Sequence, residues 1–185
     1  SRGLGDVYKR QGSTRIGKII AEKAAKNLTP ITLELGGKSP CIVDSGLDID
    51  KVAKRIVSGK FVNCGQTCIA PDYIVVNQHV KSDLISAIKE NIIKTFGNRP
   101  IESESYGRII NTNNLIRLKN ILEDQVIEFG GKINMDKLYI EPTIIVDPQI
   151  DSEIMNEEIF GPILPILSYE NESEIKNILD MNPTP

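Results

Sequence analysis

A cysteine and a glutamate are the side chains in this sequence that could carry out chemistry. Cys68 follows a run of small and polar residues, 63–67, and precedes Ile69-Ala70-Pro71. In such a segment the thiol can be exposed at the start of a helix, where the helix dipole and free amides favour the nucleophilic thiolate. The common alternative is a buried, inert cysteine. The segment makes Cys68 a candidate nucleophile and leaves both interpretations open.

Glu34 is a candidate general base. It is the next-to-last residue of the apolar run 31–35, which Gly36-Gly37 follow directly. A carboxylate at the end of a strand can point into a cleft and take a proton from a reacting group. The alternative is a solvent-facing strand residue, and the local sequence alone favours that alternative. The two glycines allow a backbone to approach a ligand closely, or simply form a turn.

The remaining polar candidates are weaker. Cys64 and Cys68 could share one face of a helix and bind a metal, but the chain has a single histidine and no second cysteine pair. We therefore expect no zinc site. Glu157-Glu158 is most simply a polar loop before a strand, and His79 is most simply a surface residue.

Alternating helices and strands must position these residues. Gly12-Ser13-Thr14 is a helix-start signal in which Ser13 or Thr14 can cap the exposed amides. Apolar spacing predicts further helices and several short strands. The helices are expected after Thr14 and at 48–62, 81–94, 111–123 and 171–179, and the strands at 31–35, 39–43, 73–76, 143–146 and 163–167. This order predicts an α/β fold.

Composition excludes several classes of protein. The 185 residues are 40% hydrophobic and 25% charged, with a formal net charge of −3 and no basic run. A main role in binding nucleic acid is therefore not expected. No apolar stretch approaches the roughly 20 residues that cross a bilayer. Three cysteines, an odd number, fit a reducing compartment, so we expect a cytoplasmic protein.

The first eleven residues need separate treatment. Residues 1–11 read SRGLGDVYKRQ, which matches, codon for codon, the translation of a widely used transposase sequencing adapter. We expect this segment to be non-native and set it apart from the fold.

Four blocks together resemble the aldehyde dehydrogenase superfamily. They are the glutamate signature at 33–40, the cysteine signature at 65–68, the nicotinamide-ribose block at 158–162 and the turn at 12–14 that meets the dinucleotide pyrophosphate. Cys68 follows Glu34 by 34 residues, in the family's order and separation. The segment 63–73 further resembles the class 3 branch, which acts on fatty and aromatic aldehydes.

The resemblance implies a mechanism. Cys68 would attack an aldehyde to give a thiohemiacetal, hydride transfer to NAD or NADP would leave a thioester, and Glu34 would activate the hydrolytic water. It also implies the cofactor-binding residues, which are Gly12, Ser13, Leu35, Glu158 and Phe160. The partners implied are a medium-chain, long-chain or aromatic aldehyde and, in the full-length enzyme, a second copy in a homodimer.

The resemblance also implies a domain division and a fragment. Residues 12–35 would end the Rossmann-like NAD(P)-binding domain, and 36–185 would form most of the catalytic domain. The family's oxyanion asparagine, its adenosine-ribose lysine and its C-terminal pairing strand are expected outside this sequence. We therefore expect the chain alone to be inactive or unstable, and a membrane-anchoring tail, which occurs in some relatives, could follow it.

Two alternatives stay open. The first is a relative that passes the thioester to coenzyme A or reduces an acyl phosphate; the presence of Glu34 argues against it, since hydrolysis needs that base. The second is a non-catalytic protein with this fold, against which the joint presence of Cys68, Glu34 and Glu158 argues.

Overall fold

The computed structural model describes residues 7–182. They divide into two compact units, one ending at Gly37 and the other beginning at Lys38.

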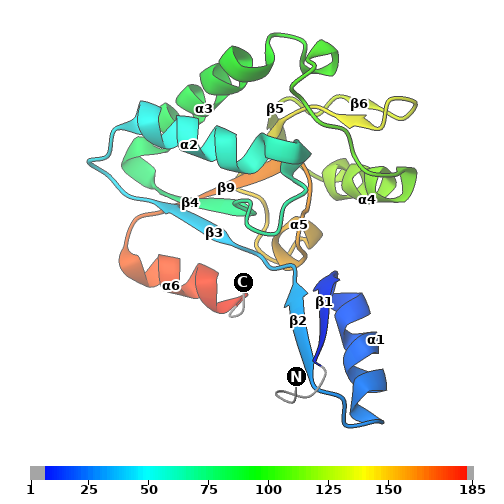
Figure 1. Ribbon diagram of the computed structural model, residues 1–185. Coiled ribbons are helices and arrows are strands. Elements are labelled where there is room, and N and C mark those ends of the chain that lie inside the picture. Colours follow the sequence, from blue (N-terminus) through cyan, green and yellow to red (C-terminus); the bar gives the residue numbers. More distant parts are fainter. Residues whose placement is uncertain (1–6, 183–185) are drawn as a thin grey trace. The chain divides into compact units, whose positions relative to one another are not determined.

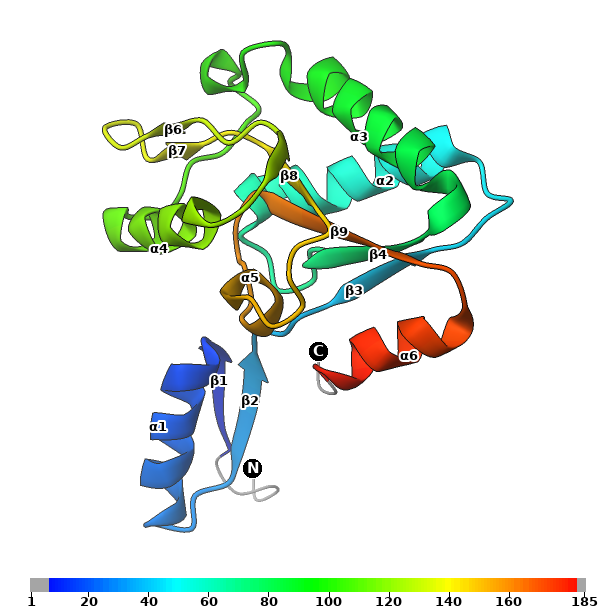
Figure 2. The same ribbon diagram turned by 180° about the vertical axis from the view of Figure 1, so that it is seen from behind.

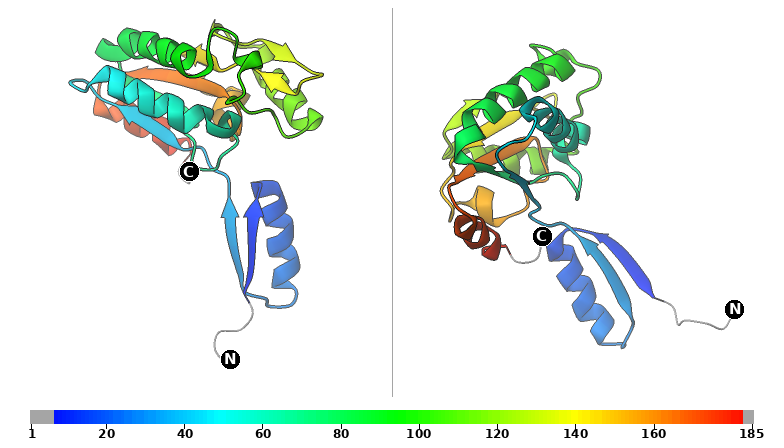
Figure 3. Two further views of the ribbon diagram at one scale, coloured as in Figure 1. Left: turned by 45° about the horizontal axis from the view of Figure 1, so that its top comes forward. Right: turned by 90° about the vertical axis from the view of Figure 1, so that its left-hand side faces the viewer.

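The first unit consists of two parallel strands and one helix. Strand β1 (Tyr8–Gly12) pairs with β2 (Ile31–Leu35), and α1 (Thr14–Ala25) connects them (Figure 3). Leu35 packs on α1, since a Cβ added to Gly17 would lie 2.7 Å from its side chain. Helix α1 begins after Ser13 as expected, but the Ser13 hydroxyl caps none of the amides of this fully described helix.

The segment that we set apart from the fold takes part in this unit. Part of it lies outside the described residues, but residues 8–11 form most of β1. These residues pair through the backbone, since parallel pairing uses only main-chain groups, and their non-native origin stays a prediction. All five residues of β1 are exposed, so the segment adds a strand without adding to a core.

The second unit is built on a five-stranded sheet in the order β3-β4-β9-β8-β5 (Figure 1). Its strands are β3 (Pro40–Val43), β4 (Tyr73–Asn77), β9 (Ile163–Tyr169), β8 (Thr143–Val146) and β5 (Ile127–Phe129). The first four are mutually parallel, and β5 is antiparallel to β8. Helices α2 (Ile49–Phe61) and α3 (Lys81–Phe96) cover one face, and α6 (Glu172–Asp180) lies on the other (Figure 2).

The other elements of this unit are short or peripheral. They are helix α4 (Thr112–Glu123), helix α5 (Glu153–Asn156), the hairpin strands β6 (Ile133–Asn134) and β7 (Tyr139–Ile140), and the 3-10 turns Val62–Gly65, Gln78–Val80 and Pro100–Glu102. The expected helices and strands are all present. Strands β5 to β7 and helix α5 were not anticipated, because two- to four-residue elements carry no periodic signal.

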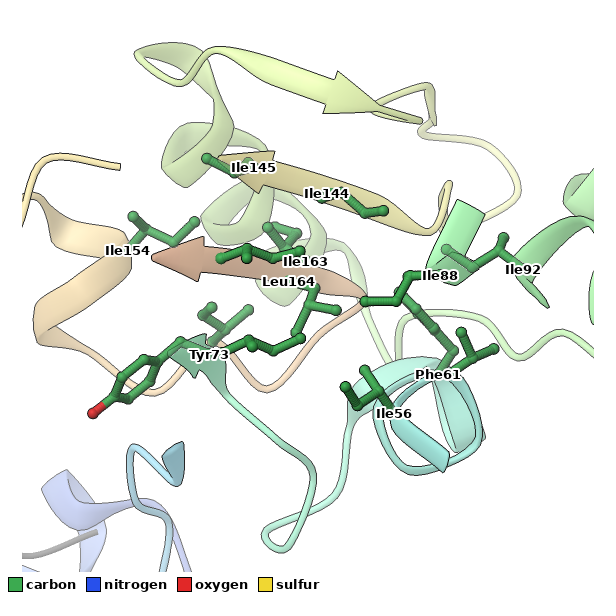
Figure 4. Packing of buried hydrophobic residues seen from close by; sticks show 14 of the residues in the cluster. Ile56, Phe61, Tyr73, Ile88, Ile92, Ile144, Ile145, Ile154, Ile163 and Leu164 are labelled. Carbon is green, nitrogen blue, oxygen red and sulfur yellow. The ribbon is translucent and has the colours of Figure 1, made fainter. Parts of the chain in front are cut away.

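The core lies between the sheet and its helices. Isoleucines from α2 and α3 meet the inner face of the strands, together with Phe61 (Figure 4). The interior strand β4 is an almost continuous buried run, typical of a parallel strand covered on both faces. This core holds fixed the ends of the strands, from which the candidate site is built.

Replacement of a central residue should cost far more stability than replacement of an edge residue. Ile74 on β4 is fully buried, whereas Ile42 on the edge strand β3 is 47% exposed. We expect Ile74→Ala to lower the free energy of unfolding by about 2–5 kcal/mol. Ile42→Ala should change it by no more than about 0.5 kcal/mol. Urea denaturation followed by circular dichroism checks this, and equal losses in the two variants would contradict the described sheet order.

Candidate active site

Three loops of the second unit meet at one edge of the sheet. Lys38 and Ser39 precede β3, residues 62–72 precede β4, and residues 157–162 precede β9. Neighbouring parallel strands begin at the same edge, so the loops that precede them are brought together. The Asp72 amide donates to the Ser39 carbonyl at 2.8 Å, which joins the first two loops directly.

The loop that carries Cys68 has an unusual backbone. Asn63 and Cys64 have φ values of 51° and 59°, and Gly65 follows at 71°. Three consecutive left-handed residues are costly and persist only where the surroundings fix them. Cys68 follows in an exposed turn in which the Ala70 amide donates to the Thr67 carbonyl at 3.1 Å.

Of the two interpretations of Cys68, the structure has the exposed thiol, and it lies in a turn rather than at the start of a helix. The turn at 67–70 does not continue into a helix, because Pro71 and β4 follow at once. The neighbouring thiol of Cys64 is buried, and burial raises its pKa to about 11. Of the two cysteines in this loop, only Cys68 is accessible.

The loop before β9 lies directly against the cysteine loop. A Cβ added to Gly65 would lie 2.3 Å from the Gly161 carbonyl oxygen, so the two backbones touch at a position that only glycine fits. Phe160, the residue before Gly161, has a φ of 45° and remains 39% exposed. The structure thus places Cys68, Glu158 and Phe160 on two loops in mutual contact.

A buried ion pair holds the loop before β9 from one side. Lys38 Nζ lies 2.5 Å from Asp72 Oδ2 and also donates to the Glu157 carbonyl at 3.0 Å. Asp72 Oδ1 accepts from the Ile159 amide at 3.0 Å. Both charged side chains are almost fully buried. One carboxylate therefore ties together the starts of all three strands.

A second lysine interacts with the same groups. Lys38, Lys60, Asp72 and Glu158 together form a charge cluster. Lys60, near the end of α2, is completely buried. Burial lowers its pKa to about 8, against the opposing effect of the Asp72 and Glu158 carboxylates, and the Lys38 ammonium lowers it further. The pKa of Lys38 is also lowered by burial, in spite of its contact with Asp72. Two cations and two anions make this cluster neutral overall.

Arg117 holds the same loop from the other side. Its guanidinium, on α4, donates to the Glu158 carbonyl at 3.3 Å and to the Ile159 carbonyl at 2.5 Å. The segment 157–159 is thus held by charged donors and acceptors on both sides, which orders the backbone that carries Glu158 and Phe160.

The other predicted site residues belong to the first unit. Glu34 lies on β2 with its side chain 54% exposed, 3.5 Å from the Lys9 ammonium. Within its unit it is the solvent-facing strand residue that the local sequence favoured. Gly12 and Ser13 are exposed where β1 ends and α1 begins, and Leu35 packs against Gly17.

Sequence reasoning missed the charge cluster and Arg117. One signal was available for the cluster: Lys60 falls on the same helical face as Ala53, Ile56 and Val57, which are all buried. A lysine on the apolar face of a helix must be paired. No comparable signal marks Asp72 or Arg117. Within residues 7–182 no group of side chains could hold a metal ion, and no helix there is both long and apolar enough to span a bilayer.

Comparisons of sequence with known proteins agree on one family. The profile named "Aldehyde dehydrogenase family" matches residues 7–184. Aldehyde dehydrogenase family 3 member A2 of Rattus norvegicus is 47% identical over 174 residues, which are 94% of this chain and 36% of that protein. The 4,4'-diaponeurosporen-aldehyde dehydrogenase of Staphylococcus aureus is 47% identical over 176 residues, 94% of this chain and 38% of that protein.

Solved structures give the same result. The substrate-bound state of Staphylococcus aureus AldH matches with a TM-score of 0.92 and 45% identity, covering 96% of this chain and 39% of that one. A Staphylococcus aureus betaine aldehyde dehydrogenase solved with NAD+ matches with a TM-score of 0.84 and 29% identity, covering 95% and 37%. The chain spans somewhat more than a third of the length of these relatives.

The close approach at Gly65 gives a prediction with a matched control. Gly65 and Gly46 both have positive φ, but only a Cβ on Gly65 meets another backbone. Gly46→Ala should cost about 1–2 kcal/mol of stability through backbone strain alone. Gly65→Ala should cost at least about 2 kcal/mol more, because it forces the two loops apart. Similar urea midpoints for the two variants would count against the described contact.

The buried lysine gives a pH-dependent prediction. In the unfolded chain Lys60 has a pKa near 10.5, and in the folded chain its pKa is about 8. Between these values the unfolded state binds more protons, so the contribution of Lys60 to stability increases as pH rises, by roughly 1 kcal/mol per unit at most. We expect the stability of the wild type relative to Lys60→Met to rise from pH 8 to pH 10. A difference that stays constant over this range would show that Lys60 is not buried in this way.

Proposed function

Because the chain belongs to the aldehyde dehydrogenase family, we propose that its residues serve the NAD(P)-dependent oxidation of an aldehyde to a carboxylic acid. The activity is proposed for an enzyme of full family length that contains this segment. The observation that carries the proposal is that Cys68 is exposed, on a loop whose Gly65 contacts the loop that bears Glu158 and Phe160.

The residues present fit a nicotinamide dinucleotide. Helix α1 begins with an uncapped Ser13 and has no acidic residue in its first turn, which suits a pyrophosphate. Phe160 is an exposed aromatic ring on a strained backbone, which suits packing near a planar ring. We propose that Gly12, Ser13 and Leu35 lie along the dinucleotide and that Glu158 binds the nicotinamide ribose.

We propose that Cys68 is the nucleophile. Its thiolate forms a bond to the aldehyde carbon, and the carbonyl electron pair moves to oxygen to give a thiohemiacetal. When bound, NAD(P) supplies the acceptor for a hydride, and this two-electron oxidation leaves Cys68 acylated as a thioester. Glu34 then takes a proton from water as the water oxygen bonds to the acyl carbon. The carbon–sulfur bond breaks, the acid is released and the thiolate is regenerated.

The substrate, partner and location are finer proposals. We propose a medium-chain, long-chain or aromatic aldehyde and a homodimer, as the resemblance of residues 63–73 to the class 3 branch implies, and a relative named as family 3 member A2 is 47% identical. A rat relative, 42% identical, is named as dimeric and NADP-preferring. Its name, together with the NAD+ complex of the betaine enzyme, supports either nucleotide as cofactor. Three free cysteines support a cytoplasmic location.

Hydrolysis is preferred over transfer to coenzyme A. The chain retains Glu34, the carboxylate that a hydrolytic enzyme needs to activate water. Its exposure on β2 leaves it free of any buried structural role within its own unit. A non-catalytic role is disfavoured because Cys68 remains accessible while Cys64, four residues earlier, is buried.

The test follows NAD(P)H formation from a medium-chain aldehyde. It uses either the longer gene product that carries this segment or the Staphylococcus aureus relative with residues 12–184 exchanged in. We expect Cys68→Ala to lower turnover by on the order of a thousandfold or more. Glu34→Gln should give one rapid equivalent of NAD(P)H and then stall as a thioester that mass spectrometry detects.

Matched variants control for side effects. Cys41→Ala and Glu22→Gln change the same residue types outside the proposed machinery and should retain activity. Full activity in Cys68→Ala would refute the assignment of the nucleophile. Steady turnover in Glu34→Gln, or acyl-coenzyme A formation by the wild type, would refute the hydrolytic role. The 185-residue chain assayed alone gives the baseline.

A further inference from the structure

We propose that Gln66 is a positioning residue that fixes the Cys68 turn in its reactive conformation. The inference rests on the proposed role of Cys68 as nucleophile. The turn at 67–70 is exposed and belongs to no helix or strand, so its geometry depends on what holds its two ends. Asp72 and the buried Ala70 hold the carboxyl end. Gln66 is the last residue before the turn at the amino end.

The carboxamide of Gln66 uses both of its N–H donors and its oxygen. Nε2 donates to the Arg108 carbonyl at 2.9 Å and to the Asn63 carbonyl at 3.1 Å. Oε1 accepts from the Ile110 amide at 2.9 Å. Donation to residue 108 and acceptance from residue 110 is the pattern that the N–H and C=O of one residue make with a neighbouring parallel strand. The Gln66 side chain therefore makes the hydrogen bonds to residues 108 and 110 that a neighbouring strand would otherwise make.

The backbone of Gln66 adds to this attachment. Its amide donates to the Asn63 carbonyl at 3.2 Å, and its carbonyl accepts from Asn63 Nδ2 at 3.1 Å. The side chains of Asn63 and Gln66 thus each donate to the backbone carbonyl of the other residue, across the left-handed segment 63–65. This accounts for how the strained segment before the turn is held.

The segment to which Gln66 is attached is itself fixed. The Arg108 guanidinium donates to the carbonyls of Tyr106, Gly107 and Ile101 at 2.7–2.9 Å. The Ile109 amide donates to the Leu138 carbonyl at 2.8 Å, and the Tyr106 hydroxyl donates to the Ile140 carbonyl at 2.9 Å. Tyr106 and Ile109 are buried. Gln66 therefore connects the loop before Cys68 to a segment that is anchored in the core.

Two substitutions of similar length separate the contributions. Gln66→Glu keeps an acceptor for the Ile110 amide but has no donor for the carbonyls of Asn63 and Arg108. Gln66→Met keeps the length and loses all three bonds. If Gln66 positions the thiol, reactivity at Cys68 should fall in the order Gln, Glu, Met, because small displacements of a reacting atom cost up to a hundredfold in rate.

The experiment measures alkylation of Cys68 by iodoacetamide in the folded 185-residue chain, with peptide mass spectrometry to distinguish it from Cys41 and Cys64. The rate in the urea-unfolded chain is the reference. We expect folded wild type to react faster than this reference, and Gln66→Met to lose at least about tenfold of the folded rate. Exposed Gln78→Met is the control and should leave the rate unchanged. Urea midpoints are measured in parallel, and the alkylation rates are compared only under conditions where each variant is folded.

The outcomes separate the two proposals. A folded Gln66→Met protein with a lower stability but an unchanged Cys68 rate would overturn the positioning role and show that Gln66 is only structural. A wild-type rate no faster than the unfolded reference would instead count against Cys68 as an activated nucleophile. If Gln66→Met does not fold, the order of Gln and Glu decides: equal Cys68 rates in wild type and Gln66→Glu overturn the proposal.

Discussion

The arrangement of the candidate site depends on the Asp72 carboxylate. It is buried against the Lys38 ammonium, and each of its oxygens is used, one by Lys38 and one by the Ile159 amide. Removal of a charge from water is costly unless every partner is in place. The cluster therefore permits one arrangement of the three loops and penalises the others. Position, rather than extra stability, is what such a buried network provides.

The place of the site in the sheet is uncommon for an open parallel sheet. Ligands in such folds usually bind beyond the carboxyl ends of the strands. Here the loops that bear Cys68 and Glu158 precede their strands and so lie at the amino ends. A helix that follows a strand begins at the opposite end of the sheet, so its amino end cannot hold these loops. They are held instead by glycine contacts, a buried ion cluster and the carboxamide of Gln66.

The sequence predicted the regular part of the fold better than the supports of the site. For helices and strands with a clear apolar period, the predicted bounds agree with the structure to within a few residues. The signature blocks identified Cys68, Glu34 and Glu158 as candidates. The local pattern left open whether Cys68 lies in a loop or at a helix start, and Pro71 and β4 leave room only for a turn. Asp72, Arg117 and Gln66 act through partners 34 to 87 residues away, and no local pattern encodes such contacts. The pairing of residues 8–11 with β2 was not anticipated, because a backbone can pair whatever its side chains are.

The order of the strands sets the order of assembly. Strand β9 is the last of the sheet in the chain, yet it lies in the middle, between β4 and β8. While the chain leaves the ribosome, β4 and β8 have unpaired inner edges until β9 is made and inserted between them. Such edges can pair with other chains. The loop that bears Glu158 immediately precedes β9, so the closing of the sheet and the completion of the site are one late event in folding.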